Sequence, residues 1–236
     1  MKGLKATINK ILAFSLFVFS GAASAGFINS GFETGDFTGW TVGGTARDHG
    51  VAVDGTPISS AHFSFQPSHV NVHSGQYAAY GTTAAHYGEF LSLSQTVNVR
   101  PGLHTIGFYM GHATGGDYWL GTDPDDRFKI GIDFAIERHQ LGIFINGVYV
   151  PFTERHPVNN FPTGSTPQDM YLFASNFIFR GPPGTANIEF RISGSGSGAA
   201  VLSIDDTFIT RVPEPSSMVL LSLGLLGLAA ARYGRN

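Results

Sequence analysis

The chain has 236 residues and a formal net charge of −3, but five of its 14 basic residues lie in the first ten and the last five positions. Between residues 26 and 212 there are nine basic and 16 acidic side chains, so this part has a net charge of −7. Nucleic-acid binding needs clustered cations that displace counterions from phosphates, and an acidic body therefore excludes that class of protein. The absence of cysteine excludes disulfides, thiol nucleophiles and thiolate metal sites.

Residues 1–25 have the three parts of a secretory signal peptide. Three lysines are followed by an apolar run over 11–19, and small residues end the segment at Ala23-Ser24-Ala25. The pair Ala23 and Ala25 forms an A-x-A cleavage signal, so cleavage is expected after Ala25. A permanent N-terminal anchor is the alternative, but the apolar run is too short to span a bilayer by itself.

Residues 26–211 are expected to form one β-rich domain. About 185 residues suffice for one substantial core. Short alternating runs separated by turn residues, with no long helical periodicity, predict a β-sandwich or barrel. The expected strands are 88–99, 102–110, 127–134, 142–150, 175–179, 186–192 and 201–210.

Three turn signals between these runs fit hairpins: Arg100-Pro101-Gly102, Asn146-Gly147 and Gly181-Pro182-Pro183-Gly184. The Asn146-Gly147 pair is flanked by two apolar runs and predicts a type I′ turn. The alternating Gly and Ser residues over 194–198 lie between two expected strands, and we expect them to form a flexible hairpin loop.

Four motifs resemble the galactose-binding-like jelly rolls, a group that includes many carbohydrate-binding modules. The chain reads NSGFETGDFTGW over 29–40 and SGQYAAY over 74–80, then LSQTV over 93–97 and IDDTF over 204–208. The resemblance implies a jelly-roll β-sandwich over 26–211. In that group a structural Ca²⁺ often joins the first and last strands, which implies Gly31, Glu33 and either Asp205 or Asp206 as ligands here.

Hard oxygen ligands from distant segments suit Ca²⁺, which takes six to eight of them. Strict strand alternation would place Leu202, Ile204, Asp206 and Phe208 on one face and Val201, Ser203, Asp205 and Ile209 on the other, and it does not choose between the aspartates. The resemblance favours Asp205. The alternative is that Glu33 and Asp205 cap turns or bond exposed backbone groups.

Other side chains suggest further sites. Tyr118 and Trp119 lie in a Gly- and Asp-rich segment and are the favoured aromatic pair for stacking against sugar rings, whereas Trp40 is expected in the core. The aspartates between 117 and 126 are expected to be a solvated acidic loop. We expect His62, His69 and His73 to be ordinary surface or loop histidines.

The C-terminal residues 212–236 combine three elements in order. Pro213-Glu214-Pro215 precedes an apolar run over 218–231, and Arg232 and Arg235 follow it. Residues 216–231 are about long enough for a short transmembrane helix, and the arginines would stay in the cytoplasm. This tail resembles the PEP-CTERM sorting signal, which implies recognition by an exosortase and processing near Pro213 to Pro215. A permanent tail anchor is the alternative.

No hydrolase elbow, zinc-protease motif or phosphate-binding glycine loop is present, so we expect a protein that is not an enzyme. The expected function is that of an exported protein, anchored in the inner membrane by its C-terminal helix and then moved to the cell surface or extracellular matrix. Its partners would be the secretion machinery, an exosortase and extracellular polysaccharide, which the β-sandwich would bind. A purely structural matrix protein and a divergent secreted hydrolase are the alternatives.

Overall fold

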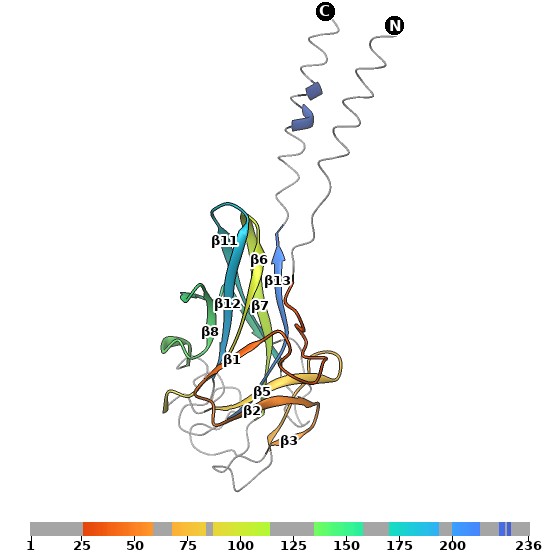
Figure 1. Ribbon diagram of the computed structural model, residues 1–236, viewed down its shortest axis with the longest axis vertical. Helices are drawn as coiled ribbons and strands as arrows, with labels where there is room; N and C mark the ends of the chain where they lie inside the picture. Colours follow the sequence, from red (N-terminus) through yellow and green to blue (C-terminus); the bar gives the residue numbers. More distant parts are fainter. Residues whose placement is uncertain are drawn as a thin grey trace, which may run out of the picture.

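A computed structural model describes residues 26–58, 68–83, 87–113, 135–157, 170–193, 200–212, 222–224 and 226–227. Within them, two antiparallel sheets form a β-sandwich, as predicted (Figure 1). Sheet A has the order β1 (Thr41–Gly44), β6 (Leu91–Val99), β12 (Gly184–Ile192), β8 (Gly142–Ile145) and β9 (Val148–Val150). Sheet B has the order β10 (Glu154–Pro157), β11 (Met170–Phe179), β7 (Gly102–Ala113), β13 (Ala200–Arg211), β5 (Tyr77–Thr83) and β2 (Asp48–Val53). A small two-stranded sheet pairs β3 (Pro57–Ile58) with β4 (Ser68–His69).

The long strands alternate between the two sheets along the chain. β5, β7, β11 and β13 belong to sheet B, whereas β6, β8 and β12 belong to sheet A. The turns at 100–102 and 181–184 therefore connect opposite sheets, and the prediction that they close hairpins is wrong. The segment 194–198 lies outside the described residues; the strands before and after it, β12 and β13, belong to different sheets. Glycine and proline mark where the chain turns, but not whether the next strand pairs beside the last one or crosses to the facing sheet.

The Asn146-Gly147 turn is the hairpin that the sequence predicts. It joins β8 to β9, and both residues have positive φ, 50° for Asn146 and 78° for Gly147. These are the backbone angles that a type I′ turn requires. The expected strand over 127–134 lies outside the described residues.

The inner faces of both sheets form one core. On β6 the odd-numbered residues from 91 to 99 face inward and the even-numbered ones face outward, and on β12 the even-numbered apolar residues face inward. The aromatic part of the core consists of Phe27, Phe32, Trp40, Phe108, Phe173 and Phe190. Each fully buried side chain of this size stabilises the fold by about 1.5–3 kcal/mol. Trp40 is 8% exposed, as expected of a core residue, and its indole N–H donates to the carbonyl of Asn29 at 3.0 Å.

A bulge interrupts β13 and changes which residues face the core. Asp205 is opposite Tyr109 of β7, but Phe208 is opposite Gly107, so the last strand carries one extra residue at this point. Asp206 has a φ of 43°. After the bulge Ile209 lies in the same core as Leu202 and Ile204, which corrects the faces expected from strict alternation.

Within the described residues, no helix has both the length and the apolar character that a membrane span requires. The described residues 135–137, 222–224 and 226–227 are helical. Most of the expected transmembrane segment 216–231 lies outside the described residues. The signal peptide, including Ala23 and Ala25, lies outside them as well.

Candidate functional site

The opening segment of the domain meets the bulge in its last strand. The carbonyl of Ser30 accepts hydrogen bonds from the backbone N–H and from the hydroxyl of Thr207, both at 3.0 Å. Gly31 faces the two aspartates closely: a Cβ at this position would lie 3.0 Å from Oδ1 of Asp206 and 3.5 Å from Oδ1 of Asp205. The structure therefore brings together three of the four residues proposed to bind Ca²⁺.

The fourth residue, Glu33, lies next to this junction but directs its carboxylate elsewhere. Both carboxylate oxygens accept from the backbone N–H of Gln76, at 3.0 and 3.1 Å, and Oε1 also accepts from the N–H of Tyr77 at 3.2 Å. A Cβ on Gly75, which has a φ of 75°, would overlap this carboxylate. The GFE and SG-x-Y motifs are therefore two halves of one contact, in which a carboxylate fixes the start of β5.

Asp205 holds the residues just before that contact. Its side chain is fully buried, and Oδ2 accepts from the backbone N–H groups of His73 at 2.8 Å and Ser74 at 3.1 Å. Oδ1 accepts from the N–H of Asp206 at 2.7 Å. Burial raises the pKa of Asp205 to about 6, and the charge of Asp206 acts in the same direction. The three backbone N–H bonds oppose this shift because they favour the ionised form.

His73 differs from an ordinary loop histidine. Its Nδ1 lies 2.7 Å from Oδ2 of Asp206, and its ring stacks on that of Tyr109 with centroids 3.6 Å apart and planes 12° apart. His69 is exposed, as expected, and His62 lies outside the described residues. The sequence spacing of the histidines gave no sign of the contact, because the bulge that turns Asp206 toward His73 is not visible in the sequence.

The LSQTV motif in β6 fixes the opening segment from the other sheet. The side-chain oxygen of Gln95 accepts from the N–H of Ile28 at 2.7 Å, while its amide nitrogen donates to the carbonyls of Ile28 at 3.1 Å and Gly39 at 2.9 Å. The other three motifs therefore fasten the first motif, at the start of the domain, to the two sheets.

The donor chemistry at the junction fits Ca²⁺ in part. Asp205 and Asp206 supply hard carboxylate oxygens beside Gly31, and two adjacent carboxylates favour a bound cation. The Glu33 carboxylate is turned toward residues 75–77, and only its Cγ approaches Gly31. Within the described parts of the chain, no three His, Asp or Glu side chains form a metal-binding group. What the structure shows is carboxylates bonding backbone amides, and Ca²⁺ binding stays a prediction.

A second concentration of aromatic and charged side chains lies on the outer face of sheet A, opposite the core. Phe190 faces the core, so Glu189 and Arg191 of β12 face outward; Phe144 pairs with Glu189, and Tyr149 with Phe144, on the same side. We call this group, together with two residues at its margin, the outer cluster. It comprises Phe90, His139, Phe144, Tyr149, Glu189 and Arg191.

The outer cluster is held by stacking and by an ion pair. The guanidinium carbon of Arg191 lies 3.9 Å from the ring centroid of Phe144 and 4.9 Å from that of Phe90. Nε of Arg191 donates to Glu189 at 2.7 Å. The rings of His139 and Tyr149 stack with centroids 4.1 Å apart and planes 17° apart. Burial raises the pKa of Tyr149 above its ordinary value.

Sequence reasoning missed the outer cluster, although a signal was present. Phe144 stands at an outward position of its strand by alternation with Ile143 and Ile145, and an aromatic residue there is a departure from the pattern. The aromatic pair that the sequence favoured, Tyr118 and Trp119, lies outside the described residues. The aspartates at 117–126 do so too.

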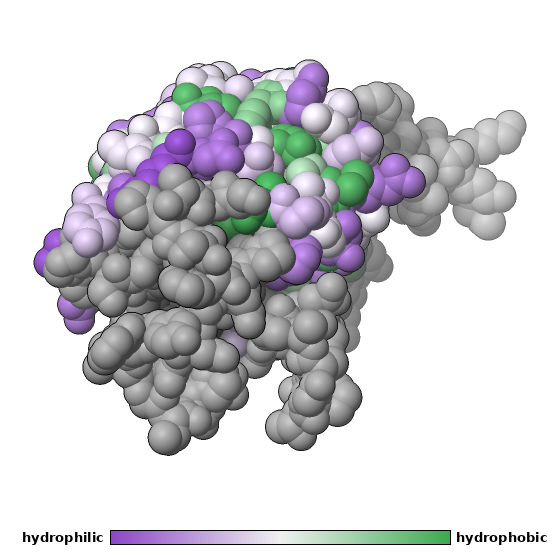
Figure 2. Space-filling view, turned by 90° about the horizontal axis from the view of Figure 1, so that it is seen from below, coloured by the Kyte–Doolittle hydropathy of each residue, from purple (hydrophilic) through white to green (hydrophobic). Residues whose placement is uncertain are grey.

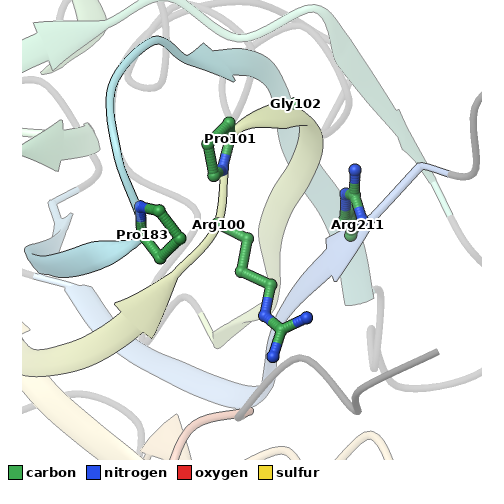
Figure 3. A pocket seen from close by; sticks show the side chains of 5 residues that line it. All are labelled: Arg100, Pro101, Gly102, Pro183 and Arg211. Atoms are coloured by element: carbon green, nitrogen blue, oxygen red, sulfur yellow. The ribbon is translucent and has the colours of Figure 1, made fainter. Parts of the chain in front are cut away.

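An open hollow of about 370 Å³ lies at one end of the sandwich, between the β6–β7 and β11–β12 turns (Figure 3). It is lined by Arg100, Pro101, Gly102, Pro183 and Arg211. The view from the opposite end shows apolar side chains scattered among polar ones, with no continuous apolar surface on the coloured part (Figure 2).

The fold and the C-terminal sequence define an antiparallel β-sandwich that carries a sorting signal. Residues 211–235 match the PEP-CTERM protein-sorting motif. The motif implies an exported protein with a C-terminal membrane-anchoring region and processing by an exosortase. Its named residues Pro213, Glu214, Pro215, Arg232 and Arg235 lie outside the described part of the chain.

The chain is similar to several solved structures, among them a xylan-binding domain and a cyclase. TmCBM61 in complex with β-1,4-galactotriose is 19% identical, with 80% of this chain and 100% of that chain covered and a TM-score of 0.36. The CBM22-1 xylan-binding domain of Paenibacillus barcinonensis Xyn10C is 16% identical, with 83% and 99% covered and a TM-score of 0.37. A cyclase from Fischerella sp. TAU is 17% identical, with 81% and 98% covered and a TM-score of 0.47. No curated protein matches the chain.

Proposed function

We propose that the protein is a non-catalytic polysaccharide-binding module that an exosortase delivers to the cell surface or extracellular matrix. The outer cluster is the observation that supports polysaccharide binding. Aromatic rings, a planar guanidinium and a carboxylate lie together there on the solvent side of a sheet. Sugar rings combine apolar C–H faces with hydroxyl groups, and this combination of side chains matches both.

The row of polar side chains beside the outer cluster favours a polymer over a single sugar as the ligand. Sheet A presents the hydroxyl and amide side chains of Ser92, Ser94 and Asn187 beside the outer cluster, at outward positions of β6 and β12. A chain of sugars laid across the strands would meet several of these groups in succession. Binding of this kind needs no general acid or base, which agrees with the proposal that the module is not an enzyme.

Affinity electrophoresis of the detergent-solubilised full chain in gels that contain different polysaccharides tests the proposal. We expect retardation by at least one polysaccharide and its loss in His139→Ala and Tyr149→Ala. Tyr87→Ala, which removes another surface tyrosine that is 66% exposed, is the matched control and should be retarded like the wild type. Equal migration in every gel would support the alternative, a purely structural matrix protein. Hydrolysis of a glycan or ester panel that is lost on replacing one carboxylate would support the secreted hydrolase.

The sorting part of the proposal has its own test. Mass spectrometry of the mature protein from its native host should find an N-terminus after Ala25 and a C-terminus near Pro213 to Pro215. A tail that remains intact to residue 236 on the surface protein would show a permanent anchor instead.

The proposal also includes a structural Ca²⁺ at the junction of the opening segment with β13. Asp205, Asp206 and Gly31 would hold it, and the positive ion would offset the repulsion between the two adjacent carboxylates. Its role would be to fasten the ends of the domain, because the residues that it joins are more than 170 positions apart in the chain.

A further inference from the structure

Three segments meet at the end of the sandwich where the last strand finishes. They are the β6–β7 turn, the β11–β12 turn and the end of β13 (Figure 1). Arg211 is opposite His104 of β7, and the N–H of Val212 donates to the carbonyl of Leu103 at 2.8 Å. Phe179 is opposite Gly102, which brings the end of β11 to the same place.

Each segment contributes one arginine, and none contributes a carboxylate. Arg100 follows β6, Arg180 follows β11 and Arg211 ends β13; we call these three residues the cationic rim. The sequence contains no Asp or Glu over 97–107, 176–188 or 207–212. Because residues 26–212 have a net charge of −7, the rim is a positive end on an acidic domain.

Rigid turns position the rim. Pro101 and Pro183 restrict the backbone beside Arg100 and opposite it, and the two arginines Arg100 and Arg211 line the open hollow with them (Figure 3). A Cβ at Gly102, which has a φ of 127°, would lie 3.1 Å from Nε of Arg211. Because Gly102 has no side chain, the guanidinium of Arg211 has room to lie across the turn.

An exposed apolar pair adjoins the rim. Leu103 and Ile178 are directly opposite each other on β7 and β11, and they are 37% and 50% exposed. Arginines beside exposed aliphatic side chains are typical of surfaces that contact lipid headgroups and the outer part of the acyl region.

The position of the rim in the chain identifies its partner. Arg211 is the first residue of the sorting motif, and only residues 213–217 separate Val212 from the apolar run that begins at Met218. Fully extended, this connection reaches about 20 Å. When the apolar run is in the membrane, the rim is therefore held near the lipid headgroups.

We propose that the cationic rim docks against anionic phospholipid headgroups while the tail is anchored. This inference rests on the membrane-anchored stage of the proposed function. Docking would hold the domain in one orientation, with the β6–β7 turn at the membrane and the β3–β4 sheet away from it. The connection over 213–217 would then be presented to a membrane enzyme at a fixed height.

The absence of cysteine gives a direct test. A fluorophore on Asn98→Cys, an exposed position two residues before Arg100, reports on the rim, and one on His69→Cys reports on the opposite end. The full chain is incorporated into lipid nanodiscs of phosphatidylcholine alone, or mixed with phosphatidylglycerol, and quenched with acrylamide, which is neutral. We expect a loss of quenching at the rim label in the anionic discs only, no change at position 69, and recovery of quenching at high salt.

Two double variants separate charge from folding. Arg100→Gln with Arg180→Gln should restore quenching of the rim label in anionic discs, while Arg100→Lys with Arg180→Lys should keep the protection. Arg211 is left unchanged because it belongs to the sorting motif. Protection that persists in the glutamine variant, or that is equal in neutral and anionic discs, would overturn the inference.

Competitors distinguish other ligands of the same chemistry. Displacement of the rim from anionic discs by millimolar inorganic phosphate would show a phosphate site in the hollow, and displacement by an anionic polysaccharide would show a glycan site; either would overturn docking to lipid. Failure of the chain to incorporate into any disc would overturn the anchored stage as well. Incorporation without protection would overturn this inference alone.

Discussion

The carboxylate of Glu33 fills the space that a side chain on Gly75 would need. The two residues are 42 positions apart, and they are joined because Glu33 accepts the N–H groups of the next two residues, Gln76 and Tyr77. A change in the opening segment at Glu33 should therefore also affect the start of β5.

This relationship predicts a large effect for Gly75→Ala. The new methyl group would displace the carboxylate and leave two backbone N–H groups without their acceptor, in addition to the strain of a φ of 75°. We expect a loss of about 2–4 kcal/mol in the free energy of unfolding, measured by chemical denaturation.

Gly55→Ala is the matched control for this measurement. Gly55 has a φ of 74°, but a Cβ there would meet nothing within 4 Å. Only the backbone strain should remain, about 1 kcal/mol. Equal losses at positions 55 and 75 would contradict the proposed contact.

Calcium should raise the melting temperature if the junction binds it. In the wild type, we expect removal of Ca²⁺ by a chelator to lower the melting temperature measured by calorimetry, since a ligand that binds only the folded state stabilises it. In Asp206→Asn the Ca²⁺-dependent part should vanish, while the folded state remains. A melting temperature that the chelator leaves unchanged in the wild type would argue against the site.

In the absence of metal, the pH dependence of the free energy of unfolding should reflect the titration of Asp205. Its pKa is about 6 in the folded protein, against 3.8 for an ordinary aspartate, so the folded state binds the proton more tightly than the unfolded state does. The resulting stabilisation is fully present below pH 3.8 and is lost as the pH rises to about 6. The slope cannot exceed about 1.4 kcal/mol per pH unit for one group.

Denaturant titrations in chelator at several pH values measure this slope. Asp205→Asn removes the titrating group, so the component between the two pKa values should disappear in that variant. The stability of the wild type is compared with that of Asp205→Asn at each pH. If the difference rises with pH through this range, the N–H bonds to Asp205 outweigh its burial.

The outer cluster should contribute to stability through packing more than through charge. Arg191→Ala would uncover Phe144, which is now 5% exposed, and would remove the stacked guanidinium; we expect a loss of about 1–2 kcal/mol in the free energy of unfolding. Glu189→Gln keeps the shape and removes only the partly exposed ion pair, so its cost should be at most about 1 kcal/mol. The reverse order of the two losses would count against the packing role.

The long strands β6, β7, β12 and β13 could be predicted from the sequence, because alternating runs between turn residues mark a strand with one buried side, whereas β1, β2 and β10 were not expected. The Asn146-Gly147 turn was predictable for a similar local reason, since few residues adopt two successive positive φ angles. The crossing of the 100–102 and 181–184 turns to the facing sheet was not predictable, because it depends on how distant strands pair. The bulge at Asp206 was hidden for the same reason, and with it the contact between His73 and Asp206.

The motifs located the junction correctly without explaining it. They brought Gly31, Asp205 and Asp206 together, and the alternative that Glu33 and Asp205 bond backbone groups describes the contacts of these two residues. No sequence pattern displays which N–H groups they meet. The cationic rim was invisible in the linear sequence because its three arginines are spread over more than 110 residues.

The last strand also determines how the domain responds to force. β13 is an inner strand of sheet B, paired with β7 on one side and β5 on the other, and its final residue, Arg211, is the first of the sorting motif. Tension on the tail therefore acts along a strand whose hydrogen bonds lie across the direction of pull, so that many bonds share the load at once. We therefore expect the domain to stay folded when its tether is pulled, and a cut upstream of Val212 would remove part of an inner strand rather than release an intact module.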